Sequence, residues 1–334
     1  MKKGLQRIST VGMSRQVWLD HRQGGLGGSD IGSIFGMDRY KPAIKLFHQK
    51  IGWWKTDEED NVAAYFGRNG EEYIYNVAWK YWDYKTNDPE QFLYYANNDI
   101  VQRKAKRVNS IIINPKYPWL RANIDYEINK HDGKGNGILE LKMPSTMHWN
   151  AYDDGIPPGY LLQLQCYMAV CGYEYGEIFA LKDGRHCEVF PYERRDSLID
   201  GLLERTHDFW ENVLEARRIV ADKSIPQEDK QMLIGQLEPD PSEEEGKAYE
   251  DYMKERFRAG FYDGAITATP DIEEARELYW SYHNKSTDYG KKKQHYKNII
   301  LNSMVSGESN AIQMKDEKLI RFDGKRLTIP KLKK

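Results

Sequence analysis

Residues 122–144 read ANIDYEINKHDGKGNGILELKMP. Apolar and polar residues alternate on both sides of a central segment that is rich in glycine. Alternation with a period of two is typical of a β-strand that buries one face, and glycines between two such runs favour a hairpin. The stretch therefore predicts two antiparallel strands joined by a turn at 131–137.

Two carboxylates, Asp125 and Glu140, are symmetric about the middle of this turn. An antiparallel pairing places them opposite each other on one face, with Cβ atoms ~5 Å apart. Like charges repel at that distance, and a divalent cation that prefers oxygen ligands, Mg²⁺ or Mn²⁺, relieves the repulsion. Lys142 shares this face, where its ammonium group can polarise a phosphate or help to activate a water. The spacing alone is also compatible with the solvated face of an ordinary hairpin.

The sequence after the hairpin predicts a strand, a helix at 158–171 and a second strand at 176–182, with an edge strand at 187–192. A strand, a crossover helix and a parallel strand form a unit whose helix packs on the sheet. Further helices are expected at 30–35, 43–51, 62–84, 196–221, 242–258 and 271–303. We therefore expect an α/β (α+β) fold with a mixed central sheet flanked by helices and a mainly helical C-terminal extension.

A polar segment with several prolines at 222–245 predicts a linker. It would separate a first domain at 1–221 from an extension of helices and a short β-hairpin at 246–334. Charge is unevenly distributed around it: residues 222–281 hold seven Lys and Arg against 16 Asp and Glu, whereas residues 285–334 hold 13 against five. Local basic patches can hold phosphates although the net charge of the chain is -2.

The composition is that of an ordinary soluble globular protein, with 40% hydrophobic and 30% charged residues. No run of ~18 apolar residues occurs, so no membrane span is expected, and the N-terminus lacks the apolar stretch of a secretory signal. The three cysteines, Cys166, Cys171 and Cys187, form no CxxC pair. A disulfide framework or a structural zinc site is not expected, and a reducing cytoplasm fits.

Asp125 and the run Glu140-Leu141-Lys142 match the PD-(D/E)xK nuclease motif. The segment GNGILELKMPST closely resembles that of the family of phage lambda exonuclease and the YqaJ-type viral recombinases, and the resemblance extends over roughly residues 15–190. Ile124 stands where the motif name has a proline, and residues beyond about 220 have no counterpart in the lambda-type enzyme. The resemblance implies a restriction-endonuclease-like core.

The resemblance also implies a role for each site residue. Asp125 would bridge two Mg²⁺ (or Mn²⁺) ions, Glu140 and the main-chain carbonyl of Leu141 would complete one metal site, and Glu71 would contribute to the second. Lys142 and Gln163 would activate the attacking water. The family's Gly-x3-Glu block maps onto FGRNGEE at 66–72, and its helical Tyr-x2-Gln-x-Gln block maps onto residues 160–165.

A phosphate pocket is expected in the block HRQGGLGGSDIGSIFG at 21–36, where the resemblance assigns Arg22 and Ser29 to a DNA phosphate. Arginine binds phosphate with two parallel hydrogen bonds, and a helix N-terminus beside it offers free amide groups. A glycine turn followed by a helix-capping serine explains the same local sequence without a ligand.

The implied activity is an exonuclease of 5′→3′ polarity on linear double-stranded DNA, which generates single-stranded overhangs for phage-type recombination. The implied partners are DNA ends, a single-strand annealing protein and further copies of the chain in a ring-like homotrimer, in the cytoplasm of a bacterial host and of phage or prophage origin. Two alternatives remain open: a RecB-like, Cas4-like or structure-selective endonuclease, and a catalytically inactive DNA-binding recombination protein. Many Cas4-like enzymes hold an iron–sulfur cluster on four cysteines, and this chain has three.

Overall fold

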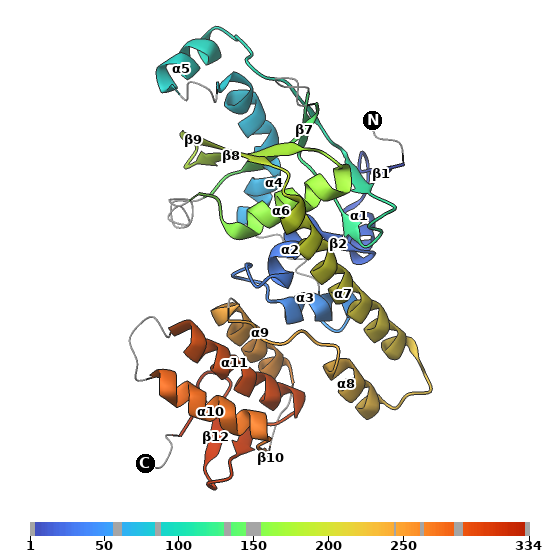
Figure 1. The fold of residues 1–334 in the computed structure, drawn as a ribbon, viewed down its shortest axis with the longest axis vertical. Coiled ribbons are helices and arrows are strands. Elements are labelled where there is room, and N and C mark those ends of the chain that lie inside the picture. Colours follow the sequence, from blue (N-terminus) through green and yellow to red (C-terminus); the bar gives the residue numbers. More distant parts are fainter. Residues whose placement is uncertain are drawn as a thin grey trace. The chain divides into compact units, whose positions relative to one another are not determined.

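The strands of the predicted hairpin, β6 (Tyr126–Ile128) and β7 (Gly137–Lys142), lie in a five-stranded sheet with the order β3-β6-β7-β8-β9. Its other strands are β3 (Ala105–Arg107), β8 (Tyr175–Lys182) and β9 (His186–Glu193). Strands β7 and β8 are parallel and all other neighbours are antiparallel. The predicted mixed sheet is confirmed (Figure 1).

The computed structural model describes residues 4–55, 62–83, 88–129, 135–144, 155–243, 245–260, 264–283 and 290–330. The chain divides into two compact units. Unit 1 comprises residues 1–32 and 55–210, and unit 2 comprises residues 33–54 and 211–334. Residues 130–134, which include most of the predicted turn, lie outside the described residues.

The register of the hairpin follows from its alternation. Tyr126 pairs with Leu139 and Ile128 pairs with Gly137, so the same register continued by one residue sets Asp125 against Glu140. Tyr126 and Leu139 belong to a hydrophobic cluster on one face of the sheet. Because side chains alternate between faces along a strand, Glu140 points to the opposite face.

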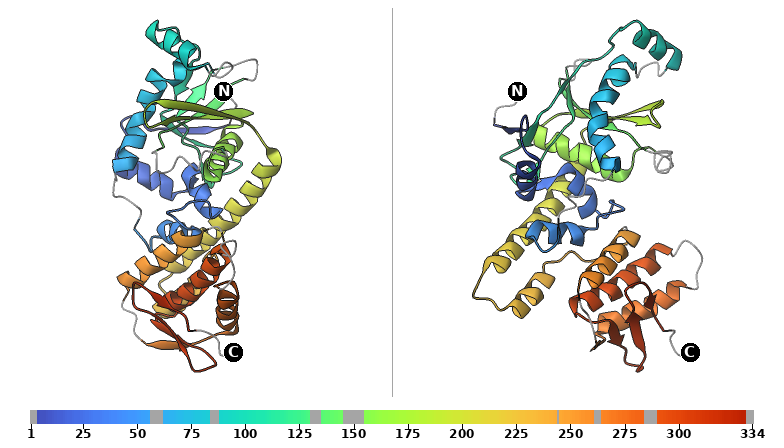
Figure 2. Two further views of the ribbon diagram at one scale, coloured as in Figure 1. Left: turned by 90° about the vertical axis from the view of Figure 1, so that its left-hand side faces the viewer. Right: turned by 180° about the vertical axis from the view of Figure 1, so that it is seen from behind.

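A helix covers each face of this sheet (Figures 1 and 2). Helix α4 (Val62–Val77) packs its Ile74 into the hydrophobic cluster that contains Leu139 and Leu141. Helix α6 (Pro158–Cys171) connects β7 to β8 and ends at Gly172, whose positive φ of 68° suits a residue without a Cβ. The α/β class with helices flanking a mixed sheet is confirmed.

Helix α4 is shorter than the helix expected at 62–84. It ends at Val77 and a 3-10 turn, η1 (Trp79–Tyr81), follows it. Trp79 is fully buried and its indole nitrogen donates a hydrogen bond to Glu177, which also pairs with Arg103. A helical period in the sequence carries no information about tertiary hydrogen bonds of this kind. The helix predicted from that period was therefore too long.

Short elements at the N-terminal end of unit 1 complete its scaffold. Strand β1 (Gln6–Ser9) pairs with β4 (Ser110–Ile113), and β2 (Leu26–Gly27) pairs with β5 (Leu120–Arg121). Helix α1 (Arg15–Gln23) precedes β2, and α2 (Gly28–Ile34) follows it. The two-residue strand β2 thereby fixes the glycine-rich segment between the two helices. Helix α5 (Pro89–Asn97) was not expected from the sequence.

Unit 2 consists of helices and a small sheet around one hydrophobic core. Its helices are α3 (Ala43–Ile51), the end of α7 (Asp196–Ala221), α8 (Gln227–Gly235), α9 (Gly246–Ala259), α10 (Pro270–His283) and α11 (Gly290–Ser306). Its sheet has the order β10-β11-β12-β13, formed by Ala265–Thr267, Ala311–Gln313, Leu319–Phe322 and Leu327–Thr328. The single helix expected at 271–303 is described as two, α10 and α11.

The observed division differs from the domain boundaries expected at 221 and 245. Residues 33–54 join unit 2 because Ile44 of α3 packs in one core with Tyr249 and Met253 of α9. The expected linker at 222–245 contains helix α8, of which Ile234 is buried. A contact between segments about two hundred residues apart leaves no local signal in the sequence.

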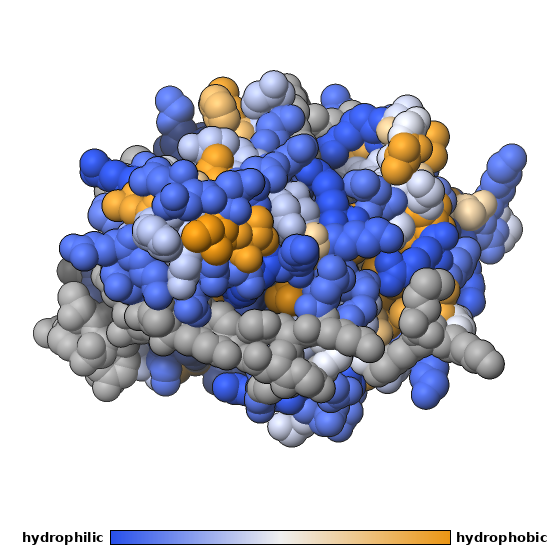
Figure 3. Space-filling model, turned by 90° about the horizontal axis from the view of Figure 1, so that it is seen from above, coloured by the Kyte–Doolittle hydropathy of each residue, from blue (hydrophilic) through white to orange (hydrophobic). Residues whose placement is uncertain are grey.

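Within the described residues, no helix is long and apolar enough to cross a membrane. Figure 3 shows a face of the molecule on which hydrophilic residues predominate and hydrophobic residues gather in several small patches. Patches of this kind are normal on the surface of a folded domain.

Candidate active site

Two carboxyl groups, one buried and one partly buried, lie side by side at the central sheet. Asp125 directly precedes β6, and its Oδ2 accepts a hydrogen bond of 2.8 Å from the backbone nitrogen of Leu141. Glu140 lies on β7 with 1% of its surface exposed. The backbone bond explains why Asp125 is held against β7 although it lies outside the regular strand.

Glu140 receives two hydrogen bonds on the same oxygen. Lys142 Nζ and Gln163 Nε2 each donate to Glu140 Oε2 at 3.1 Å. Gln163 Nε2 also lies 3.2 Å from the hydroxyl oxygen of Tyr167, one helical turn further along α6. The side chain of Glu140 therefore faces helix α6, as the strand alternation requires.

The second oxygen of Glu140 has no such partner. Oε1 is buried and accepts no hydrogen bond from any residue that the structure describes. A buried carboxylate oxygen without a donor costs free energy on the order of 1–3 kcal/mol. Such an oxygen is a ready ligand for a cation.

Burial and mutual repulsion perturb the pKa values of this cluster. Burial, followed by the negative charge of Asp125, raises the pKa of Glu140 to about 8. Burial also raises the pKa of Asp125, against the opposing charge of Lys142. Burial alone would lower the pKa of Lys142, but the nearby carboxylates Glu140 and Asp125 raise it above its ordinary value. The site thus holds more negative charge than Lys142 alone stabilises well.

These features fit a hard divalent cation at Asp125 and Glu140. The donors are carboxylate oxygens, the type that Mg²⁺ and Mn²⁺ prefer, and Glu140 Oε1 accepts no hydrogen bond within the described part of the chain. Among the residues with described positions, no three His, Cys, Asp or Glu side chains converge closely enough to form a ligand set by themselves. The protein would therefore need main-chain oxygens, water or substrate to complete the coordination.

Glu71 lies on α4 and lines the same cavity of about 600 Å³ as Asp125, Glu140, Lys142 and Gln163. Its Oε2 pairs with Arg107 Nη2 at 3.2 Å, and the adjacent Glu72 pairs with Arg107 Nη1 at 3.5 Å. Glu71 was expected to bind a metal ion, whereas its pairing with Arg107 was not expected from the sequence. Arg107 ends the basic run QRKAKR at 102–107, and that run was the only signal for it.

Arg22 and Ser29 come together although they belong to different helices. Arg22 Nη2 donates to the hydroxyl oxygen of Ser29 at 2.8 Å and pairs with Asp30 at 3.2 Å. Asp30 is 1% exposed and its other oxygen accepts from the backbone nitrogen of Gly27 at 3.0 Å. Asp30 therefore fixes the orientation of Arg22.

The cavity of about 600 Å³ reaches from the carboxylates to this arginine. Arg22 and Trp18 line it together with Asp125 and Lys142, and Arg22 and Ser29 also line a smaller cavity of about 70 Å³. The arginine carbon Cζ lies 5.0 Å from the ring centre of Trp18. Arg22 and the predicted metal-binding pair thus line one continuous space within unit 1, and Ser29 lines the smaller cavity beside Arg22.

Comparison with known proteins places the whole site in one matched region. The family model described as a YqaJ-like viral recombinase domain matches residues 17–174, a range that contains every predicted site residue. The uncharacterized protein YqaJ of Bacillus subtilis (strain 168) is 27% identical over 299 residues, which are 89% of this chain and 80% of that protein.

Two solved structures of one enzyme are also similar. The alkaline exonuclease LHK-Exo from Laribacter hongkongensis aligns with a TM-score of 0.47 and 18% identity, and its complex with dAMP aligns with 0.48 and 19%. Each alignment covers 63% of this chain and 97% of the other.

Proposed function

Because residues 17–174 match the family model of a YqaJ-like viral recombinase domain, we propose that the protein is a metal-dependent deoxyribonuclease that resects the ends of linear double-stranded DNA. We further propose 5′→3′ polarity, so that the product is a duplex with a single-stranded overhang suited to strand annealing. The overhang would be the substrate of a single-strand annealing protein. The oligomer would be a ring-like trimer that encloses DNA.

The unpartnered oxygen of Glu140 carries this proposal. Glu140 is 1% exposed, lies against Asp125 and Lys142, and leaves Oε1 without a hydrogen bond from the described residues. An ordinary hairpin in solution would instead expose its charged face to water. A site that places a buried carboxylate, a second carboxylate and a lysine beside a cavity is suited to hydrolysis of a phosphodiester.

Asp125, Glu140, the main-chain carbonyl of Leu141 and Glu71 would hold two Mg²⁺ or Mn²⁺ ions. When bound, these ions would neutralise charge on the phosphate and lower the pKa of a bound water. Within the protein, Asp125 is held by the backbone nitrogen of Leu141 and Glu71 by Arg107. These contacts limit the freedom of both carboxylates before any ligand arrives.

Lys142 and Gln163 would position the attacking water. Both side chains already meet at Glu140 Oε2, so a water beside that oxygen has an ammonium and an amide within reach. The raised pKa of Lys142 keeps its charge at neutral pH, which favours electrostatic stabilisation of a negatively charged transition state over proton removal by the lysine itself.

Arg22 and Ser29 would bind the phosphate at the end being digested. The Arg22 guanidinium is oriented by Asp30 and rests against Trp18, so it is preorganised for an anion. The terminal phosphate would bind to Arg22 at one end of the cavity. A following phosphodiester would then lie at the metal ions beside the carboxylates.

The decisive experiment is digestion of a linear duplex labelled at one end, compared with a covalently closed circle of the same sequence, in buffer with Mg²⁺. We expect the linear DNA to be degraded from its 5′ ends and the circle to remain intact, and chelation of the metal to stop the reaction. Cleavage of the circle would favour a structure-selective endonuclease, and no cleavage of either DNA would favour an inactive DNA-binding protein.

Glu140→Gln keeps the shape of the side chain and removes its charge. We expect it to lower the rate of cleavage by at least about 10²-fold, as is typical for loss of a group that stabilises the transition state, with an unchanged circular dichroism spectrum. Glu204→Gln, on an exposed position of α7, is the matched control and should retain full activity. Wild-type activity in Glu140→Gln would contradict the assignment of the metal site.

A further inference from the structure

Three consecutive lysines, Lys291, Lys292 and Lys293, lie in the first turn of helix α11 in unit 2. Lys297, one turn further along the helix, pairs with Glu250 at 2.7 Å. Among the residues that the structure describes, no carboxylate forms an ion pair with any of the first three lysines. Each of the three is at least partly exposed. They form a cluster of positive charge at the start of α11, called the lysine cluster below.

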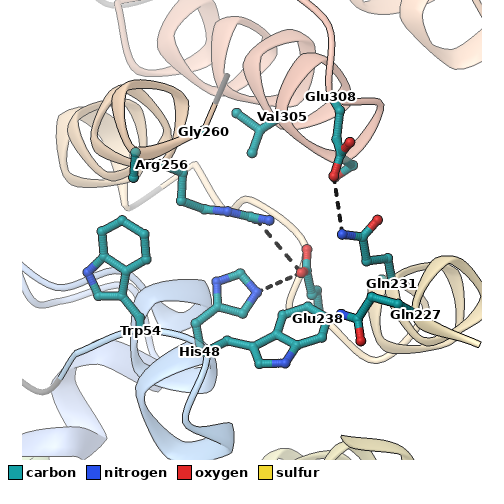
Figure 4. Close-up of a pocket in the computed structure, with 13 residues that line it drawn as sticks. His48, Trp54, Gln227, Gln231, Glu238, Arg256, Gly260, Val305 and Glu308 are labelled. Atoms are coloured by element: carbon teal, nitrogen blue, oxygen red, sulfur yellow. Dashed lines mark hydrogen bonds and ion pairs between the residues drawn. The ribbon is translucent and has the colours of Figure 1, made fainter. Parts of the chain in front are cut away.

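Other charged side chains of unit 2 are paired within the chain. Arg276 is buried and donates to both carboxylate oxygens of Asp316. Beside a cavity of about 370 Å³, Glu238 lies 3.8 Å from Arg256 and 2.6 Å from His48 Nε2 (Figure 4). Pairs of this kind satisfy charges inside the fold. The lysine cluster is not used in this way, so it can bind an anion from outside the chain.

Aromatic side chains adjoin the lysine cluster. Helices α10 and α11 pack against each other (Figure 1), and the last turns of α10 supply Tyr279 and Tyr282. Lys293 Nζ lies 5.6 Å from the ring centre of Tyr279, and Lys292 Nζ lies 5.5 Å from that of Tyr282. The ring of Tyr282 is parallel to that of Tyr296 within 2°, with centres 6.0 Å apart. All three tyrosines are partly exposed, so aromatic rings and ammonium groups share one surface.

The carboxylates of α10 are set apart from this surface. They lie at 271–277, before the last turn of the helix, which is the turn that meets the lysine cluster. At a rise of 1.5 Å per residue, Asp271 lies about 12 Å along the axis from Tyr279, and solution charges separated by more than about 10 Å are largely screened. Glu277 precedes Tyr279 by two residues, and residues two apart on a helix do not face each other. The surface therefore keeps its positive charge.

A single strand of nucleic acid fits this combination of groups. Its phosphates attract ammonium groups, and its unpaired bases stack on aromatic side chains. A duplex offers the same phosphates but keeps its bases within its own stack. The tyrosines would therefore add to the binding of a single strand and not to that of a duplex.

We propose that the lysine cluster and the three tyrosines form a surface that binds single-stranded DNA, the form of DNA that the proposed resection leaves. The choice of DNA rests on the proposed function. The binding itself does not depend on the metal site, because every residue of this surface belongs to unit 2.

Fluorescence anisotropy of the full chain tests this proposal, with a labelled oligothymidylate of about 15 nucleotides, a length that one single-strand-binding module can cover. A chelator in the buffer prevents digestion, so failure of the proposed nuclease activity would leave the result intact. The triple variant Lys291→Gln, Lys292→Gln, Lys293→Gln should bind at least about tenfold more weakly at ~0.1 M salt. The slope of log K against log salt concentration should fall by about 2, because each phosphate contact to a single strand contributes about 0.7.

A second triple variant, Lys223→Gln, Lys315→Gln, Lys325→Gln, is the matched control. It also removes three exposed lysines of unit 2, so it changes the net charge by the same amount. It should keep the affinity and the salt dependence of the wild type. Equal weakening by the two triple variants would mean diffuse attraction between charges and would overturn the proposal.

Tyr282 distinguishes a single strand from a duplex. Tyr282→Leu should weaken binding of the oligothymidylate at least about fivefold, the loss expected for one stacked base, and should leave binding of a duplex of the same length unchanged. Tyr282→Phe keeps the ring and should bind like the wild type. The proposal fails if Tyr282→Leu binds the single strand normally, or if it weakens binding of both DNAs equally.

Discussion

Arg22, the proposed phosphate ligand, is held in a fixed orientation by its neighbours. Its guanidinium is held by Ser29 and by the buried Asp30, and it rests against the ring of Trp18. An arginine fixed in this way loses less side-chain entropy on binding a phosphate than a free one does. Its contribution should therefore be visible at one phosphate rather than along the whole DNA.

Arg22→Ala should abolish the preference for a phosphorylated 5′ end. Wild-type protein should degrade a 5′-phosphorylated duplex about tenfold faster than the same duplex without the phosphate, since a charge-assisted hydrogen bond contributes ~1.5–3 kcal/mol. The measurement compares initial rates on the two duplexes, and Arg22→Lys, which keeps the charge, is the control. If Arg22→Ala still discriminates between the ends, Arg22 is not the phosphate ligand.

His48 gives unit 2 a predictable response to acid. Because burial lowers its pKa in the folded protein, the unfolded chain binds a proton first as the pH falls. The stabilising contribution of neutral His48 is present above pH ~6.5, the ordinary histidine pKa, and is lost as the pH falls through the lower pKa of the folded state.

Thermal unfolding between pH 7 and pH 5 checks this prediction. The loss of stability of the wild type should exceed that of His48→Gln by at most ~1.4 kcal/mol per pH unit, the limit for one proton. His186→Gln, at an exposed position on β9, should follow the wild type. Identical pH profiles for wild type and His48→Gln would show that His48 does not control the acid response.

At the scale of elements, the position of α2 depends on Gly28. A Cβ at Gly28 would lie 2.4 Å from a ring carbon of Tyr167, closer than atoms can approach. Tyr167 is the hydroxyl partner of Gln163, which in turn contacts Glu140. The glycine-rich segment therefore allows α2 and α6 to approach each other next to Gln163 and its partner Glu140.

Gly28→Ala should destabilise the protein by at least about 1–3 kcal/mol, the usual cost of overpacking, and should lower the rate of cleavage by displacing Tyr167. Gly201→Ala is the opposite control, because Gly201 lies within α7 and a Cβ there meets nothing within 4 Å. It should stabilise the helix by about 0.5–1 kcal/mol. Unfolding curves of both variants test these two predictions. An unchanged stability of Gly28→Ala would show that Tyr167 moves away from the added methyl group without cost.

At the scale of the whole molecule, residues 33–54 link the two units through the chain. This segment follows Arg22 and Ser29, the proposed phosphate ligands, in sequence, yet Ile44 packs in the core of unit 2. The N-terminal part of the matched family region therefore depends on residues beyond 221 for part of its packing. A fragment that ends at 221 removes α9 and α11, which carry residues of the core in which Ile44 packs.

The fragment 1–221 should consequently be less stable than the full chain and should bind a dye specific for exposed hydrophobic surface. Burial of a side chain such as Ile44 contributes ~1.5–3 kcal/mol, and Ala43 and His48 lose their hydrogen bonds to Glu245 and Tyr252 as well. Thermal unfolding and dye fluorescence of the fragment and the full chain provide the test. A fragment that unfolds at the full-length temperature without binding dye would contradict the dependence of α3 on unit 2.

The sequence by itself determined the elements whose pattern is local. Alternation predicted β6 and β7 and the register that sets Asp125 against Glu140, and the expected helix at 43–51 is observed at those residues. The helix expected at 158–171 is observed as α6, and Gly172 directly after it adopts the left-handed conformation that glycine tolerates. These features follow from backbone geometry and from neighbours a few residues apart, so they can be inferred without the rest of the fold.

Only the tertiary structure decided the features that depend on distant segments. The unpartnered oxygen of Glu140, the pairing of Glu71 with Arg107, and the inclusion of α3 in unit 2 all arise where separate parts of the chain meet. Burial and electrostatic potential are sums over everything nearby in space, and sequence spacing does not fix which residues those are.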